Sequence, residues 1–163
     1  MRIVLTTFRR VPYAGAVFLG LALVIAALSV EVSALELQPF ARLSFQVVTG
    51  ALLLTCLSYQ WVLFAKRVLK DARGMRSHVK LHRWVGVSAT LLFAVHAVRV
   101  GHVWMTLLSA VFFLVALTGV LNREVLGYRS NLLYLIWLAL HIGLSAAMVP
   151  LIAVHIWVAL AYQ

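Results

Sequence analysis

The sequence predicts an all-α fold, a polytopic membrane bundle of five transmembrane helices. Of its 163 residues, 64% are hydrophobic and only 11% are charged, and the mean hydropathy is +1.04. A soluble domain carries about 25% charged residues. The apolar residues form long unbroken runs, without the period-two alternation of a membrane β-barrel. Because backbone groups in lipid must be hydrogen-bonded within the chain, we expect these runs to be helices.

The spans are expected to form a single transmembrane domain over residues 1–163. The first span, with its basic start, is longer than the apolar core of a signal peptide, so we expect it to be retained as an anchor. The last is longer than the hydrocarbon core requires and must tilt, kink or protrude. Pro150 offers a kink point, because it cannot donate to the carbonyl of Ala146. The five predicted spans are residues 12–30, 43–64, 82–98, 103–121 and 132–162.

The distribution of basic residues predicts the orientation. The formal net charge is +10, and three segments that these spans place on one side of the membrane hold twelve of the 14 Lys and Arg residues. These segments are residues 2–10, 66–83 and 123–129, and only Arg42 and Arg99 lie on the other side. Positive loops face the cytoplasm. We therefore expect a bacterial inner-membrane protein with a cytoplasmic N-terminus and a periplasmic C-terminus, in contact with membrane lipid and not with nucleic acid.

Four histidines within the apolar runs are the candidate functional residues, because ionisable side chains in a membrane are rare and usually functional. His82 and His96 are 14 residues apart on the third span, and His141 and His155 are 14 apart on the fifth. This spacing puts each pair on one helix face, about 21 Å apart along the axis. Because the third and fifth spans are parallel, His82 is expected level with His141, and His96 level with His155.

The spacing favours two haem groups over other metal centres. Ligands about 21 Å apart cannot converge on one zinc ion, and no carboxylate lies in either span to complete two zinc sites. A haem needs only two axial ligands from the protein, and its apolar faces suit a helix bundle. The chain has no CxxCH motif, so the haems are expected to be non-covalent. The alternative is that the histidines are polar residues that hold helices together.

Residues around the histidines fit this hypothesis. Gly86, one turn after His82, is expected to let a flat macrocycle approach the backbone. Lys80, Arg83 and Arg99 are candidates to bind haem propionates, although ordinary interfacial snorkelling explains them equally well. Two further glycines, Gly50 and Gly119, are explained by close approach to haem or by close helix packing. His78 and His102 are expected at the membrane interface.

Two His-x13-His pairs on next-but-one helices resemble the di-haem membrane cytochromes b, of the ferric reductase-like transmembrane and cytochrome b561-like superfamily. The resemblance covers about residues 43–162 and implies four helices forming a haem-binding bundle. It also implies two haem b groups with bis-histidine ligation, the inner held by His82 and His141 and the outer by His96 and His155. Because no flavin or nicotinamide domain follows the fifth span, we expect another chain to supply or accept the electrons.

The sequence therefore predicts an electron-transfer subunit rather than an independent enzyme, with no catalytic residue of its own. It would carry electrons across the membrane between a quinone pool and a partner redox protein or dehydrogenase subunit. One alternative is a stand-alone haem reductase of ferric iron or oxygen at the outer face. Another is a haem-free structural or assembly subunit.

Overall fold

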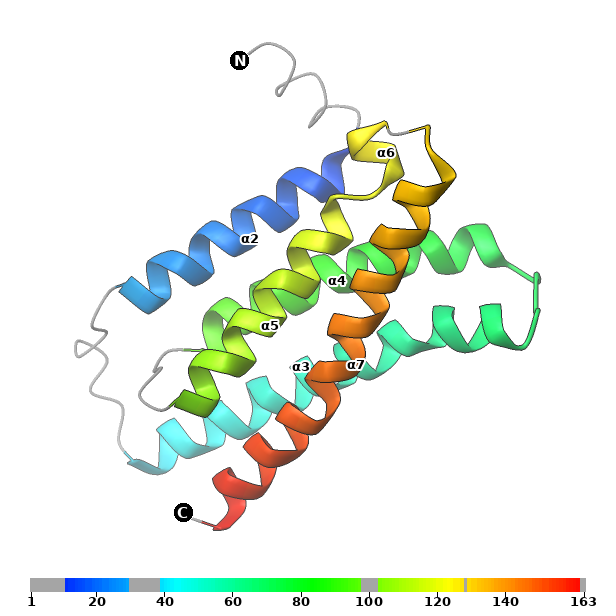
Figure 1. The fold of residues 1–163 in the computed structure, drawn as a ribbon. Coiled ribbons are helices and arrows are strands. Elements are labelled where there is room, and N and C mark those ends of the chain that lie inside the picture. Colours follow the sequence, from blue (N-terminus) through cyan, green and yellow to red (C-terminus); the bar gives the residue numbers. More distant parts are fainter. Residues whose placement is uncertain (1–10, 30–38, 98–102, 128, 162–163) are drawn as a thin grey trace. The chain divides into compact units, whose positions relative to one another are not determined.

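The computed structural model describes residues 11–29, 39–97, 103–127 and 129–161. Within these ranges every regular element is a helix (Figure 1). The helices are α2 (Pro12–Ser29), α3 (Pro39–Val68), α4 (Met75–His96), α5 (Val103–Val120), α6 (Arg123–Leu126) and α7 (Asn131–Ala161). The all-helical prediction is confirmed for this part of the chain.

Three of these helices are long and apolar enough to cross a membrane. They are α3 over Leu43–Val68, α5 over its whole length and α7 over its whole length. The apolar part of α2, Pro12–Ala26, is shorter. Few side chains in the three long apolar stretches are buried by the protein itself, and such surfaces are favourable only in an apolar solvent such as lipid.

The bounds of α2, α5 and α7 agree with the predicted spans to within one residue where they are described, whereas α3 extends four residues beyond its predicted span at each end and α4 begins earlier than predicted. This helix begins at Met75, seven residues before His82, whereas the predicted span begins at His82 itself. The additional two turns carry Arg76 and Lys80. Four-residue helix α6 has no counterpart among the predicted spans. Val98 and Tyr162, at the predicted ends of the third and fifth spans, lie outside the described residues.

The helices belong to two compact units, and each is described by itself. In the first unit, α2 and α3 both pack against α4. Gly20 on α2 lies so close to α4 that a Cβ atom there would be 2.8 Å from Thr90 Cγ2. The buried α2 side chains recur every three or four residues, which defines one helix face. They are Tyr13, Ala14, Val17, Leu21 and Val24.

The turn between α3 and α4 is held by an ion pair. Lys66 Nζ lies 2.6 Å from Asp71 Oδ2, and the backbone N–H of Arg73 donates to Asp71 Oδ1 at 3.0 Å. The hydrogen bond from Lys66, and next that from Arg73, lower the pKa of the Asp71 carboxyl below its usual value. Gly74, directly before α4, has φ +64°, a left-handed conformation that glycine adopts without steric penalty.

In the second unit, α5 packs against α7. Short helix α6 begins because Asn122 caps it, its Oδ1 accepting from the backbone N–H of Glu124 at 2.9 Å. It ends at Gly127, which is left-handed with φ +63°. Helix α7 runs through Pro150, which cannot donate to the carbonyl four residues earlier.

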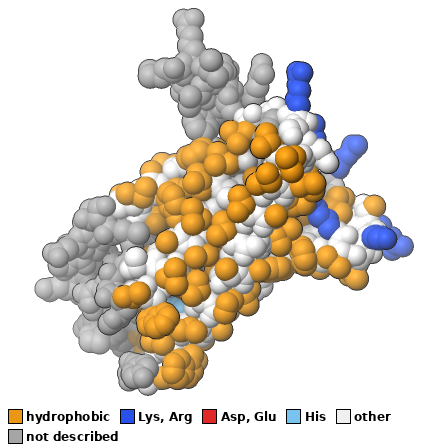
Figure 2. All heavy atoms as spheres, in the orientation of Figure 1, with side chains coloured by type: hydrophobic (Ala, Val, Ile, Leu, Met, Phe, Trp, Pro, Cys, Tyr) orange, Lys and Arg blue, Asp and Glu red, His pale blue; other side chains and the backbone are white. Residues whose placement is uncertain are grey.

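Hydrophobic side chains cover most of the described helical surface seen in Figure 2, and the Lys and Arg side chains visible there lie toward helix ends. On α7, for example, Leu132 is 66% exposed and Leu160 is 69% exposed. We therefore treat the chain as a membrane protein. That the two units join in one five-span bundle stays a prediction.

Candidate functional site

The four candidate histidines lie on two long helices. His82 and His96 are on α4, and His141 and His155 are on α7. All four are half-buried. Neither helix is interrupted between its two histidines, so the 14-residue spacing becomes a helical rise of about 21 Å on both. The two helices belong to different units, and the surroundings of each histidine are described within its own unit.

His96, the last residue of α4, lies against a Thr-Gly pair on α3. Thr49 Oγ1 is 3.1 Å from His96 Nδ1. A Cβ atom on Gly50 would be 3.1 Å from His96 Cε1, which is tighter than ordinary van der Waals contact. Thr49 is buried, with 7% of its surface exposed. A larger residue at position 50 would push the imidazole away, so the glycine sets how closely the ring approaches α3.

His141 on α7 has the same kind of neighbours, on α5. Thr118 Oγ1 is 3.0 Å from His141 Nδ1, and a Cβ atom on Gly119 would be 3.4 Å from His141 Cε1. Trp137, one turn earlier on α7, stacks on the imidazole with a centroid distance of 5.8 Å and an interplanar angle of 6°. The indole Nε1–H donates to the backbone carbonyl of Thr118 at 2.7 Å. The ring of His141 is therefore held by both helices.

His82 is contacted through its backbone by a polar side chain on α3. Gln60 Nε2 donates to the carbonyl of His82 at 3.1 Å. The same amide nitrogen is the nearest neighbour of Gly86, at 3.7 Å from the position of a Cβ atom. Gly86, expected from the sequence to face a macrocycle, thus lies beside Gln60. Among the four candidate histidines, the rings of His96 and His141 are the ones that lie within 4 Å of the Cβ position of a described glycine, Gly50 and Gly119 respectively.

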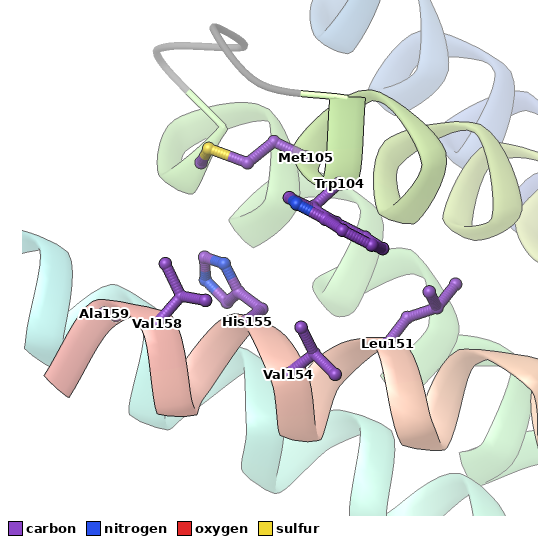
Figure 3. A pocket seen from close by; sticks show the side chains of 7 residues that line it. All are labelled: Trp104, Met105, Leu151, Val154, His155, Val158 and Ala159. Atoms are coloured by element: carbon purple, nitrogen blue, oxygen red, sulfur yellow. The ribbon is translucent and has the colours of Figure 1, made fainter. Parts of the chain in front are cut away.

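His155 lines an apolar pocket of about 170 Å³ between α5 and α7. Figure 3 shows its imidazole pointing from α7 toward Trp104 and Met105 on α5. The other lining residues are all apolar and lie on α7: Leu151, Val154, Val158 and Ala159. The pocket surrounds His155 with mainly apolar side chains, whereas His141 lies beside a threonine hydroxyl.

The three basic residues predicted to bind propionates have different positions. The guanidinium of Arg83 lies over the ring of Tyr13 on α2, at 4.8 Å from the centroid, which is a cation–π contact. Lys80 is exposed. Arg99 lies outside the described residues, as does His102. The remaining histidine, His78, lies in the first turn of α4, where its Nδ1 is 3.4 Å from the hydroxyl of Tyr59.

The sequence analysis did not single out the two threonines. A signal for them exists, because the dipeptide Thr-Gly recurs in VVTGALLL on α3 and in ALTGV on α5. Its meaning depends on contacts between residues 47 and 23 positions apart in the chain. Across the described residues, no three His, Cys, Asp or Glu side chains come together as a metal site.

Comparison of the chain with protein-family models, with curated proteins and with solved structures finds no match.

Proposed function

We propose that this chain is a di-haem b-type cytochrome subunit of a bacterial inner membrane, which carries electrons between a quinone pool and a partner redox protein. His82 and His141 would hold the inner haem, and His96 and His155 the outer haem. Haem iron supplies one-electron chemistry when bound, and the chain's own residues hold its axial ligands and exclude water from it.

The observation that carries this proposal is the equal spacing of two histidine pairs on two uninterrupted helices. Two stacked macrocycles need the same rise on both supporting helices. The lengths of the helices support the same idea, because His82 lies seven residues into α4 and His141 ten residues into α7. His82 and His141 are therefore each two to three turns inside their helices. The predicted start of the third span had placed His82 at a helix end.

The described surroundings fit haem ligands. Two of the four imidazoles lie beside glycines, which have no side chain to cover the ring edge, and all four imidazoles are half-buried. The pocket beside His155 is lined almost wholly by apolar groups, which suits the face or edge of a porphyrin. The arrangement offers one axial nitrogen per histidine.

The proposed orientation follows from the charges. We place α2, α3, α4, α5 and α7 across the membrane as five spans, with the N-terminus in the cytoplasm. The basic residues of the α3–α4 turn and the start of α4 would then face the cytoplasm, where anionic lipid or an acidic partner attracts them. A reporter enzyme fused after Gln163 should be active in the periplasm, and activity in the cytoplasm would contradict this orientation.

Haem counting tests the function. The full chain, purified in detergent from cells supplied with haem, should give two haem b per chain in a pyridine haemochrome assay. Absence of haem would favour the structural or assembly subunit. A chain that alone reduces ferric iron or oxygen at full rate would favour the stand-alone reductase over a subunit that needs a partner.

Ligand replacement tests the pairing. His96→Ala and His155→Ala should each remove the same haem, and His82→Ala and His141→Ala the other, identified by their separate midpoint potentials. His78→Ala is the matched control, because this histidine lies on α4 without belonging to a pair, and it should retain both haems. If His96→Ala and His155→Ala removed different haems, the pairing would be wrong.

A further inference from the structure

Two threonines on different helices make the same contact with two of the candidate histidines. The Thr49 hydroxyl on α3 is 3.1 Å from His96 Nδ1, and the Thr118 hydroxyl on α5 is 3.0 Å from His141 Nδ1. In both cases the next residue is a glycine whose Cα faces the Cε1 edge of the same ring. The arrangement occurs once in each compact unit, so it does not depend on how the units are joined.

The direction of these hydrogen bonds follows from the other partner of each hydroxyl. Thr49 Oγ1 donates to the carbonyl of Phe45 at 2.8 Å, and Thr118 Oγ1 donates to the carbonyl of Leu114 at 2.9 Å. A hydroxyl has one hydrogen to donate and two lone pairs that accept. Because the hydrogen is used within the helix, each hydroxyl accepts from the ring. Since a carbonyl oxygen can only accept, this arrangement favours the ring proton on Nδ1 of His96 and of His141.

We infer that Thr49 and Thr118 are positioning residues, which hold His96 and His141 in the Nδ1–H tautomer and leave Nε2 as the nitrogen that offers a lone pair to a metal centre. The role of these residues toward iron rests on the proposed function. The assignment of the tautomer rests on the threonine contacts alone. His96 and His141 belong to different proposed pairs. Each haem would thus receive one imidazole fixed by a threonine hydroxyl.

The hydrogen bond has a consequence for the potential of the iron. An imidazole that donates its second N–H is a more basic ligand and keeps its ring orientation, and it favours ferric over ferrous iron. Removal of the hydroxyl should therefore raise the midpoint potential of the haem concerned. If removal of the hydroxyl weakened the preference for ferric over ferrous iron tenfold, the midpoint potential would rise by about 59 mV for this one-electron couple. We take this value as the upper end of the expected shift.

The test uses valine and serine substitutions in the full-length chain. Thr49→Val and Thr118→Val keep the side-chain shape and remove the hydroxyl, and Thr49→Ser and Thr118→Ser keep the hydroxyl. Thr55→Val is the matched control, because Thr55 is also on α3 and also donates to the carbonyl four residues earlier, Ala51, at 2.8 Å. Thr55 is exposed and lies six residues after Thr49 on α3.

Two readouts separate the inference from the proposed function. Optical redox titration should show Thr49→Val raising the potential of one haem and Thr118→Val that of the other, with serine restoring both and Thr55→Val changing neither. Nuclear magnetic resonance of histidine-labelled, dithionite-reduced chain in bilayers should show protonated Nδ1 at His96 and His141, with a hydrogen-bonded proton shift that each valine variant abolishes. This second readout does not require bound haem.

The outcomes are distinct. A proton on Nε2 of His96 or His141 in the wild-type chain would overturn the inference, even if the valine variants failed to fold. So would valine variants that leave both the proton shifts and the potentials unchanged, or a Thr55→Val variant that shifts them equally. A wild-type chain without haem but with protonated Nδ1 at both positions would overturn the proposed function and support the tautomer assignment.

Discussion

Gly20 on α2 should not tolerate a methyl group. The Cβ atom of alanine at this position would lie 2.8 Å from Thr90 Cγ2 and 3.2 Å from Thr90 Cβ, whereas carbon atoms make favourable contact at about 3.5–4.0 Å. Thr90 is only 1% exposed, and its hydroxyl donates to the carbonyl of Gly86 at 2.8 Å. The methyl group of Thr90 therefore cannot rotate away without breaking that hydrogen bond.

The size of the effect follows from two opposing terms. Overpacking of a close contact costs about 1–3 kcal/mol. Alanine in place of glycine inside a helix returns up to about 1 kcal/mol through backbone entropy. We expect Gly20→Ala to lower the free energy of unfolding by up to about 2 kcal/mol, and to be about 1–3 kcal/mol less stable than a glycine-to-alanine change without the close contact. Gly143→Ala, on α7, is the matched control, because nothing lies within 4 Å of its Cβ position, and it should be neutral or slightly stabilising.

The assay is unfolding by added sodium dodecyl sulfate in mixed micelles, followed by circular dichroism. Thr90→Ser removes the Cγ2 methyl group that causes the shortest contact, so Gly20→Ala should be less harmful in that background. The double-mutant cycle isolates the contact itself. If Gly20→Ala were as stable as Gly143→Ala, or if Thr90→Ser gave no relief, the close approach of α2 to α4 would be refuted.

Two further predictions concern the α3–α4 turn and the histidine pocket. Carbon-13 resonance should show that the pKa of the Asp71 carboxyl is below the ordinary aspartate value of about 3.9, because the Lys66 ammonium donates a hydrogen bond to the charged carboxylate. The ion pair then stabilises the turn above the ordinary pKa, and this stabilisation is lost as the pH falls through the lowered pKa. If Lys66→Met left the titration midpoint of Asp71 unchanged, this prediction would be contradicted. If haem is bound as proposed, Gly50→Ala should change the absorption and paramagnetic resonance spectra of the haem held by His96 more than Gly119→Ala changes those of the other haem. The reason is that the added carbon atom lies 3.1 Å from the imidazole at position 50 and 3.4 Å at position 119. The reverse order would contradict the idea that these glycines allow the rings to approach the neighbouring helix.

The sequence predicted the long helices well because unbroken apolar runs have few alternatives in a membrane. The start of α4 was less predictable. Arg76 and Lys80 lower the hydropathy and exclude these turns from an apolar window, yet both residues are good helix formers. The helix therefore continues beyond the apolar run to Met75, and the apolar pattern marks the expected membrane segment rather than the end of the helix.

The histidines were predictable and their neighbours were not. A pair of histidines on one helix face is visible as a spacing of 14 residues. The contact of Thr49 with His96 joins two helices, and single-sequence periodicity gives no information on which residues of two helices lie at the same height. Gly86 is an example: its place one turn after His82 could not show that Gln60 on α3 is its nearest protein neighbour, and the predicted contact with haem stays a prediction. Small residues near a ligand are ambiguous until the opposite helix is known.

Because of Pro150, the two helices that carry the candidate histidines, α4 and α7, differ in how easily they bend. In α4 the segment between His82 and His96 has no proline, so every interior peptide N–H there is available to the helical ladder. In α7 the segment between His141 and His155 lacks one backbone hydrogen bond, because Pro150 has no N–H to donate. The distance between His82 and His96 is therefore fixed by an unbroken helix, whereas the distance between His141 and His155 can change if α7 bends at Pro150.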